Sequence, residues 1–219
     1  MTDFTRRVRA SAALLAFSWS VVSVAYATES PEPPAAEAVK VVEALHTVVL
    51  GVMKEADTLG YQGRCDRLAP VLRDLYDIPF MAQKSVGRYW KGTSEEERQH
   101  LLKTFTEFMI ANYAGNFDGY SGQVFETLDE EPSTHGTVLV RTRLLDPDGE
   151  ATQLNYRLRP VDGEWKIIDV YLNGTVSELA LRRSEYSSLI QREGFDSLIV
   201  ALNRKITDLS QSTPADQGP

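Results

Sequence analysis

The spacing of apolar residues divides the chain into a helical first half and an extended second half. Between residues 36 and 59, apolar side chains recur at helical spacing, which predicts an amphipathic helix. Similar spacing predicts helices over 64–76 and 78–86, the latter with a proline in its first turn. Ser94 and Glu97 fit a capping box at the start of a long helix with aromatic residues along one side. The first half is therefore predicted to be helical.

After residue 123 the apolar residues alternate with polar ones, which is the period of a strand. The alternating stretches lie at 124–128, 138–144, 153–159 and 165–172. Asp146-Pro147-Asp148-Gly149 and Asp162-Gly163 predict tight turns, and links this short join antiparallel strands. Thr175-Val176-Ser177-Glu178 fits a second capping box, and two helices separated by Gly194 follow it. We therefore expect an α+β fold, with N- and C-terminal helices packed on a curved antiparallel sheet of about four strands.

The stretch from residue 163 to residue 174, GEWKIIDVYLNG, is apolar on both faces. Strict alternation would place Ile168, Val170 and Leu172 on one face, lining a cavity. The other face would hold Trp165, Ile167 and Tyr171 beneath flanking helices, together with Asp169. A carboxylate among aromatic residues fits a general base with a raised pKa, or a structural anchor that accepts hydrogen bonds. Because Asp169 has no histidine partner nearby in the sequence, the structural interpretation is favoured.

The N-terminus is typical of an export signal. Three arginines lie within its first nine residues, an apolar run follows, and Ala25-Tyr26-Ala27 fits a cleavage site. We expect a signal peptide over 1–27, a disordered tether over 28–37, a single domain over 38–209 and a disordered tail over 210–219. An uncleaved membrane anchor is the alternative to a cleaved signal.

Charge and cysteine content narrow the class of protein further. The net charge is −8 at pH 7, and loss of a signal peptide with three arginines and one aspartate would make it −10. Such acidity argues against nucleic acid as a partner. The one cysteine, Cys65, allows no internal disulfide. Export combined with a reduced chain indicates a bacterial periplasm.

Catalytic and metal-binding signatures are sparse. The sequence contains no glycine-rich phosphate loop, no nucleophile elbow and no two-histidine zinc helix. His46, His100 and His135 fall in distant segments, so a shared metal site is not expected. We predict no catalytic residues, no metal and no cofactor.

The apolar residues of the strands and helices are the candidate binding residues. They fill an ordinary core, or they line an apolar cavity between sheet and helices that suits a hydrophobic ligand. The candidates for a lipid-binding wall are Phe80, Val86, Trp90, Phe105, Phe108, Met109, Val138, Val140, Leu154, Tyr156, Leu158, Ile168, Val170, Leu172, Leu189 and Phe195. Four arginines on two strands, Arg141, Arg143, Arg157 and Arg159, either meet a phosphate or a partner, or form a solvated face.

The order of several short motifs resembles a known family. The motifs are Gly87-x-x-Trp90 before a serine-capped aromatic helix, Trp165-x-x-x-Asp169-Val170, and a helical Arg183-x-x-Tyr186 followed by Gly194. This combination, spread over 38–209, resembles the MlaC-like (toluene-tolerance auxiliary) family of periplasmic lipid carriers. Gly174-Thr175-x-Ser177-Glu178-Leu179 looks like the form found in the hopanoid-biosynthesis-associated branch.

The resemblance implies a fold related to the cystatin-like nuclear-transport-factor folds, with an added helical subdomain and an enclosed apolar cavity. It implies a monomeric periplasmic carrier that holds the acyl or polycyclic part of a phospholipid or hopanoid and serves a membrane lipid-transport complex. The alternative is a small isomerase or hydrolase on the same type of fold, with Asp169 as base beside Tyr156 or Tyr171. A structural adaptor without a ligand is a weaker third possibility.

Overall fold

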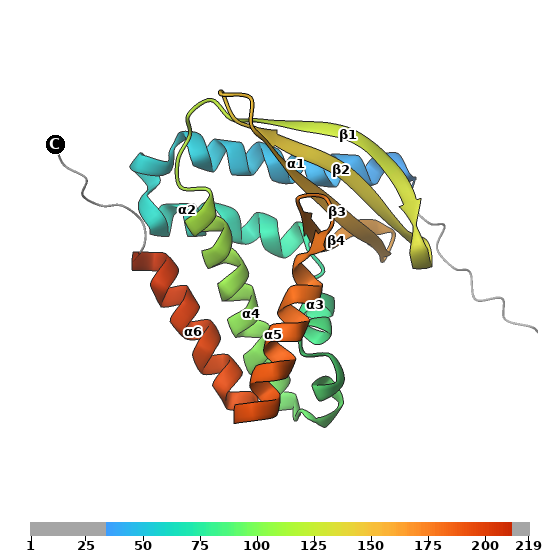
Figure 1. Ribbon diagram of the computed structural model, residues 1–219, viewed down its shortest axis with the longest axis vertical. Helices are drawn as coiled ribbons and strands as arrows, with labels where there is room; N and C mark the ends of the chain where they lie inside the picture. Colours follow the sequence, from blue (N-terminus) through green and yellow to red (C-terminus); the bar gives the residue numbers. More distant parts are fainter. Residues whose placement is uncertain (1–33, 212–219) are drawn as a thin grey trace, which may run out of the picture.

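The computed structural model describes residues 34–211, so the expected signal peptide and most of the expected tether and tail lie outside the described residues. Over this range the chain forms six α-helices, two short 3-10 helices and one antiparallel sheet of five strands in the order β1-β2-β3-β4-β5. Figure 1 shows the sheet at one end of the molecule and a group of helices running away from it. This is the α+β arrangement that the sequence predicts.

One group of helices precedes the strands in the sequence, and a second group follows them. The first group comprises α1 (Ala35–Lys54), α2 (Ala56–Leu75), α3 (Ile78–Val86), the 3-10 helix η1 (Gly87–Gly92) and α4 (Glu95–Asn116). The second group comprises α5 (Glu178–Glu193) and α6 (Phe195–Gln211). Because α1 begins at Ala35 and α6 ends at Gln211, the edges of the expected tether and tail are helical.

Local signals set several of the helix ends. The Asp77 carboxylate accepts a hydrogen bond from Phe80 N at 3.1 Å and caps α3. Ser94 and Glu97 form both bonds of the predicted capping box. The single helix predicted over 36–59 is wrong, because α1 ends at Lys54 and α2 is kinked at Gly60, whose φ is +59°.

The strands are longer than the sequence pattern suggests. They are β1 (Val124–Ser133), β2 (Thr137–Leu145), β3 (Ala151–Val161), β4 (Glu164–Leu172) and β5 (Val176–Ser177), with the 3-10 turn η2 (Thr134–Gly136) after β1. The expected count of about four strands is corrected by β5, which the sequence suggested was part of a helix cap. Ser177 is the residue that caps α5, accepting from Ala180 N at 3.0 Å. Thr175 lies before the cap, in the turn after β4.

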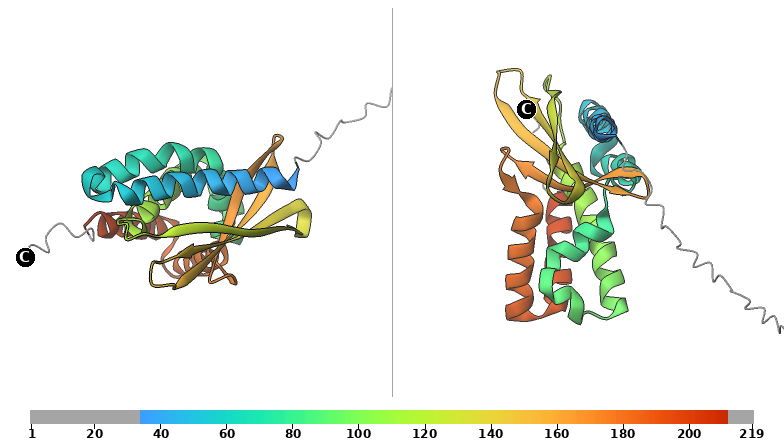
Figure 2. Two further views of the ribbon diagram at one scale, coloured as in Figure 1. Left: turned by 90° about the horizontal axis from the view of Figure 1, so that it is seen from above. Right: turned by 90° about the vertical axis from the view of Figure 1, so that its right-hand side faces the viewer.

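Two β-bulges interrupt the pairing of the long strands. One falls between Thr127 and Asp129 of β1, and the other lies opposite Arg157 and Leu158 of β3. A bulge bends a strand and increases its twist. Figure 2 shows the resulting curved sheet, with α1 and α2 lying beside it and α4, α5 and α6 extending below.

The main core lies where α1 and α2 meet the sheet and α4. Among its fully buried members are Val42, Leu45, Leu68, Leu72, Phe105, Leu158 and Ile167. The described part of the chain contains no helix that combines the length and apolar character needed to cross a membrane.

Candidate ligand-binding cavity

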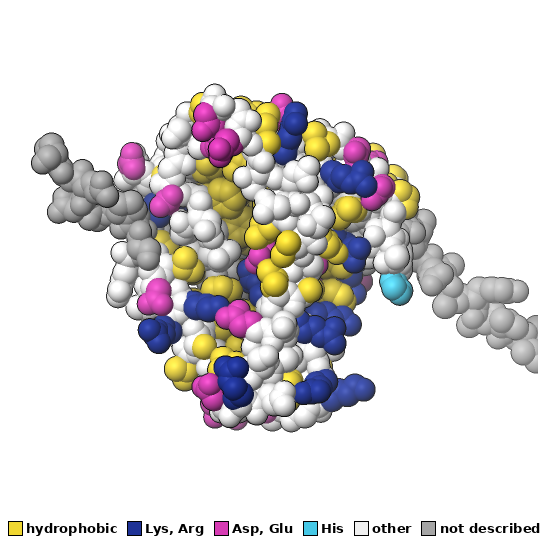
Figure 3. All heavy atoms as spheres, viewed as in Figure 1, with side chains coloured by type: hydrophobic (Ala, Val, Ile, Leu, Met, Phe, Trp, Pro, Cys, Tyr) yellow, Lys and Arg dark blue, Asp and Glu magenta, His cyan; other side chains and the backbone are white. Residues whose placement is uncertain are grey.

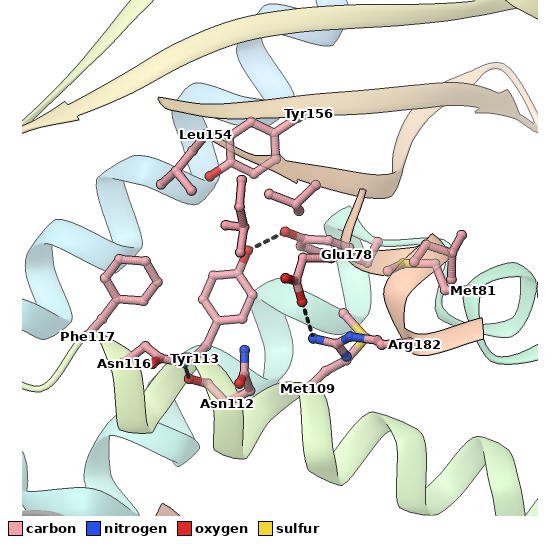
Figure 4. A pocket seen from close by; sticks show the side chains of 14 residues that line it. Met81, Met109, Asn112, Tyr113, Asn116, Phe117, Leu154, Tyr156, Glu178 and Arg182 are labelled. Atoms are coloured by element: carbon pink, nitrogen blue, oxygen red, sulfur yellow. Dashed lines mark hydrogen bonds and ion pairs between the residues drawn. The ribbon is translucent and has the colours of Figure 1, made fainter. Parts of the chain in front are cut away.

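A cavity of about 280 Å³ lies between the inner face of the sheet and helices α4 and α5. Its lining residues come from α3, α4, β3, β4, α5 and the end of α2: Tyr76, Met81, Met109, Asn112, Tyr113, Asn116, Phe117, Leu154, Tyr156, Val170, Leu172, Glu178, Leu179 and Arg182. Figure 4 shows these side chains converging from the strands above and the helices below. In Figure 3 the surface is hollowed in this region, and hydrophobic side chains are visible inside the hollow.

The sheet side of the cavity is mostly apolar because of strand register. Leu154 pairs with Leu172 and Tyr156 pairs with Val170, so these four side chains share one face of β3 and β4. Met109 and Phe117 of the α4 region close the opposite side. An apolar surface of this kind favours a hydrocarbon over water.

Three tyrosine hydroxyls in the cavity wall already have hydrogen-bond partners. Tyr76 and Tyr113 bond each other through their hydroxyls, and Tyr156 bonds His46 Nε2 at 3.1 Å. Burial raises the pKa of Tyr113 to about 12, whereas the nearby Arg182 charge acts in the opposite direction. These hydroxyls therefore remain neutral at physiological pH, and each already has a hydrogen-bond partner within the protein.

One charged pair lies in the cavity wall. Arg182 Nη2 is 3.3 Å from Glu178 Oε2, one turn apart on α5. Figure 4 shows Arg182 and Asn112 at the helical side of the cavity, below the tyrosines. The side chain of Arg182 is 14% exposed and that of Glu178 is 28% exposed, so both lie at the rim of the cavity rather than in its interior.

The structure distributes the sequence candidates over several places. Met109, Leu154, Tyr156, Val170 and Leu172 line the cavity. Phe80 and Trp90 line a separate groove beside Arg98 and Arg159. Val86, Phe105, Phe108, Val138, Val140 and Leu158 are buried in the core cluster, and Leu189 and Phe195 pack against it. A role of these residues in lipid binding stays a prediction.

The alternation predicted for β4 is wrong because of its bulge. Asp169 pairs with Arg157, and Ile167 pairs with Leu158, which leaves Ile168 as the extra residue. Trp165 and Ile167 therefore share the inner face with Val170 and Leu172, whereas Ile168 does not line the cavity.

Asp169 is held by three donors on the other face of β4. Its Oδ1 accepts from Val170 N at 2.9 Å and from Leu179 N at 3.0 Å, and its Oδ2 accepts from Ser177 Oγ at 2.5 Å. Burial raises the pKa of Asp169, while these hydrogen bonds act in the opposite direction. Both oxygens are thus engaged in fixing the β4–α5 connection, as a structural anchor would be.

The strand arginines have partners of their own. Arg141 pairs with Asp129 and Glu131, and Arg143 pairs with Glu126. Arg159 forms an ion pair with Asp77, and Arg157 donates to Ser133 Oγ at 3.1 Å. None of these four residues lines the cavity described here. They brace the sheet and its junction with α3.

The polar lining residues were missed by sequence reasoning. Asn112 and Tyr113 lie at the end of α4, whereas Glu178 and Arg182 lie on α5, over sixty positions later in the chain. Helical spacing gives one usable signal, since Glu178 and Arg182 are separated by one turn. Nothing in the sequence indicates that the two segments meet across a cavity. Among residues 34–211 there is no cluster of three or more potential metal ligands.

Together the fold and the cavity define a class of protein: an α+β domain with a half-open apolar pocket between a curved sheet and a helical layer. The family model described as "MlaC protein" matches residues 43–204. The chain belongs to the MlaC family.

Two known proteins illustrate the similarity. The chain is 29% identical over 132 residues to the intermembrane phospholipid transport system binding protein MlaC of Haemophilus influenzae, and the match covers 58% of this chain and 61% of that protein. A phospholipid-binding protein from Ralstonia solanacearum, solved in complex with a phospholipid, shares the fold with a TM-score of 0.69. That match is 19% identical and covers 81% of this chain and 99% of the other.

Proposed function

We propose that this protein is a periplasmic carrier that holds the acyl part of a phospholipid in the cavity between β3, β4, α4 and α5. The observation that carries the proposal is an apolar cavity whose hydroxyl groups are already hydrogen-bonded, which leaves a surface suited to hydrocarbon. Each CH₂ group transferred from water gains about 0.8 kcal/mol, so acyl chains alone supply a large driving force. Membership of the MlaC family supports the same function.

The size of the cavity bears on how a lipid enters. Its volume of about 280 Å³ is close to the lower end of the range of about 300–1,000 Å³ for small-molecule pockets. A lipid with two acyl chains is larger than the usual ligand of such a pocket. We therefore infer that the walls separate when the lipid binds, and that its binding energy offsets the loss of wall contacts.

The carrier has no catalytic step in this proposal. The alternative of an isomerase with Asp169 as base gains no support, because its two oxygens accept bonds from Val170 N, Leu179 N and Ser177 Oγ. Asp169 also pairs with Arg157 on the face opposite Val170.

The finer features of the function follow from the resemblance of the sequence motifs. We propose an exported monomer that exchanges lipid with a membrane transport complex. The Gly174-Thr175-x-Ser177-Glu178-Leu179 motif leads us to propose a hopanoid as a second cargo. Offering both lipids to the same delipidated protein tests which one is preferred.

Native mass spectrometry of the protein purified from the periplasm, followed by lipid extraction, tests the carrier function. We expect the wild type to carry lipid in a defined ratio to protein. Val170→Trp adds a large ring to the cavity wall and should lower lipid occupancy to about a tenth or less of the wild-type value. Val176→Trp is the matched control, since Val176 is 41% exposed and does not line the cavity.

Two results would contradict the proposal. One is a wild-type protein that emerges empty and takes up no lipid from vesicles. The other is a folded Val170→Trp variant that carries as much lipid as the Val176→Trp control.

A further inference from the structure

Arg182 has unused hydrogen-bonding capacity at the rim of the cavity. A guanidinium carries five N–H donors in a planar fork. Within residues 34–211, the guanidinium makes one ion pair, with Glu178 at 3.3 Å. The tyrosine hydroxyls of the same wall are satisfied by each other and by His46. Arg182 is therefore the strongest donor group left for a ligand in this cavity.

The guanidinium is also held in place by aromatic rings. Its central carbon lies 5.0 Å from the ring centroid of Phe108 and 6.0 Å from that of Phe105. Cation–π contact with these rings restricts the position of the guanidinium. With 14% exposure, the side chain is shielded enough for an ion pair to be stronger than on an open surface.

The position of Arg182 matches the polar end of an amphiphile. Asn112 lies beside it in the lining of the cavity, and the apolar residues Leu154, Val170 and Leu172 lie on the strand side (Figure 4). A ligand with its hydrocarbon against the strands would place its polar group near α5. The fork geometry of an arginine fits two oxygens of one phosphate.

We propose that Arg182 binds the phosphate of the lipid headgroup and thereby selects phosphate-bearing lipids over neutral ones with the same acyl chains. The proposal rests on the carrier function proposed above. Glu178 shares the guanidinium with the phosphate, and its negative charge weakens the binding of an anion. Removing that charge is therefore expected to strengthen phosphate binding.

A competition between two lipids with identical acyl chains tests the assignment. Delipidated mature protein is mixed with detergent micelles that contain equal amounts of phosphatidic acid and diacylglycerol, and native mass spectrometry measures the ratio of the two complexes. We expect the wild type to favour phosphatidic acid about tenfold, the effect of one charge-assisted bidentate contact. Arg182→Gln should bring the ratio close to one and retain diacylglycerol binding.

Two further variants separate the role of Arg182 from general effects on charge and folding. Arg183→Gln removes the neighbouring arginine, which is exposed and does not line the cavity, and should leave the ratio unchanged. Arg182→Lys keeps the charge but loses the fork, so an intermediate ratio is expected. Glu178→Gln should raise the ratio severalfold above wild type.

The outcomes distinguish this inference from the proposed function. Uptake of neither lipid by the wild type would overturn the carrier function. Uptake with an unchanged ratio in Arg182→Gln would overturn only the headgroup assignment. Inorganic phosphate in about hundredfold excess should not change the wild-type ratio, because the headgroup is tethered to a buried chain. If excess inorganic phosphate abolished the preference for phosphatidic acid over diacylglycerol, Arg182 would be a site for free phosphate, and the headgroup assignment would be wrong.

Discussion

Beneath α1 the sheet meets a closed apolar layer, whereas beside α5 the same sheet faces a cavity. The buried stripe of α1, which includes Val42, Leu45 and Val52, has no exposed surface. On the cavity side, Val170 and Leu172 of β4 are only partly buried, and they face polar residues of α4 and α5 such as Asn112 and Arg182. Apolar side chains of the same types therefore fill a closed core beneath α1 and line a cavity beside α5.

Replacing one leucine by alanine on each side is expected to give the largest difference in stability between the closed core and the cavity wall. Leu45→Ala leaves a void in a fully packed environment and should lower the free energy of unfolding by about 4 kcal/mol. Leu172→Ala should cost only about 1 kcal/mol, because Leu172 lines the cavity, is only partly buried and has fewer protein contacts to lose. Urea denaturation of both variants measures the difference. Equal losses in the free energy of unfolding would contradict the distinction between a closed core and a cavity wall.

The dependence of stability on pH tests whether His46, which connects α1 to the cavity wall, is held neutral by burial. His46 lies on α1, stacks on Phe125 with ring centroids 3.9 Å apart, and hydrogen-bonds Tyr156 of the cavity wall. Burial lowers its pKa from 6.5 to about 4. Between these values the unfolded chain binds a proton that the folded chain does not, so stability falls as pH drops from about 6.5 towards 4.

The loss expected from His46 over that window is about 3 kcal/mol. Denaturation curves at several pH values measure it, with His46→Gln as the comparison. The variant should be less stable at pH 7 and should show a shallower loss on acidification. A wild type and variant with parallel pH profiles would show that His46 is not held neutral by burial.

The smallest expected effect concerns the connection from the sheet to α5. Asp169→Asn keeps an acceptor for Leu179 N but weakens the bond with Ser177, and should cost about 1 kcal/mol. Lipid occupancy should stay at the wild-type level, because Asp169 does not line the cavity. Loss of lipid from a variant that is still folded would mean that Asp169 takes part in binding.

Local signals allowed some elements to be predicted well. The bounds of α3 agree with the sequence, because an aspartate cap and an early proline fix where the helix starts and Gly87 follows its end. The capping box of α4 and the turn at Asp146, where Gly149 N donates to Asp146 O at 2.9 Å, are confirmed for the same reason. Each of these depends on residues only a few positions apart.

Features that depend on distant residues were beyond the sequence pattern. The bulge at Ile168 reflects pairing with β3 and reverses the facing of half of β4, which periodicity alone does not reveal. Arg182 and Asn112 meet at the cavity only because α5 packs near α4 in the folded chain. The relation to cystatin-like folds stays a prediction.

Mapping where a bound acyl chain lies shows whether the cavity is the lipid-binding site. The wild-type protein can be incubated with vesicles that contain phosphatidylglycerol with a photoreactive diazirine on its acyl chain, irradiated, digested and mapped by mass spectrometry. We expect adducts on residues that line the cavity, such as Met109, Phe117 and Leu172. Adducts confined to exposed apolar residues such as Leu181 and Val200 would contradict it.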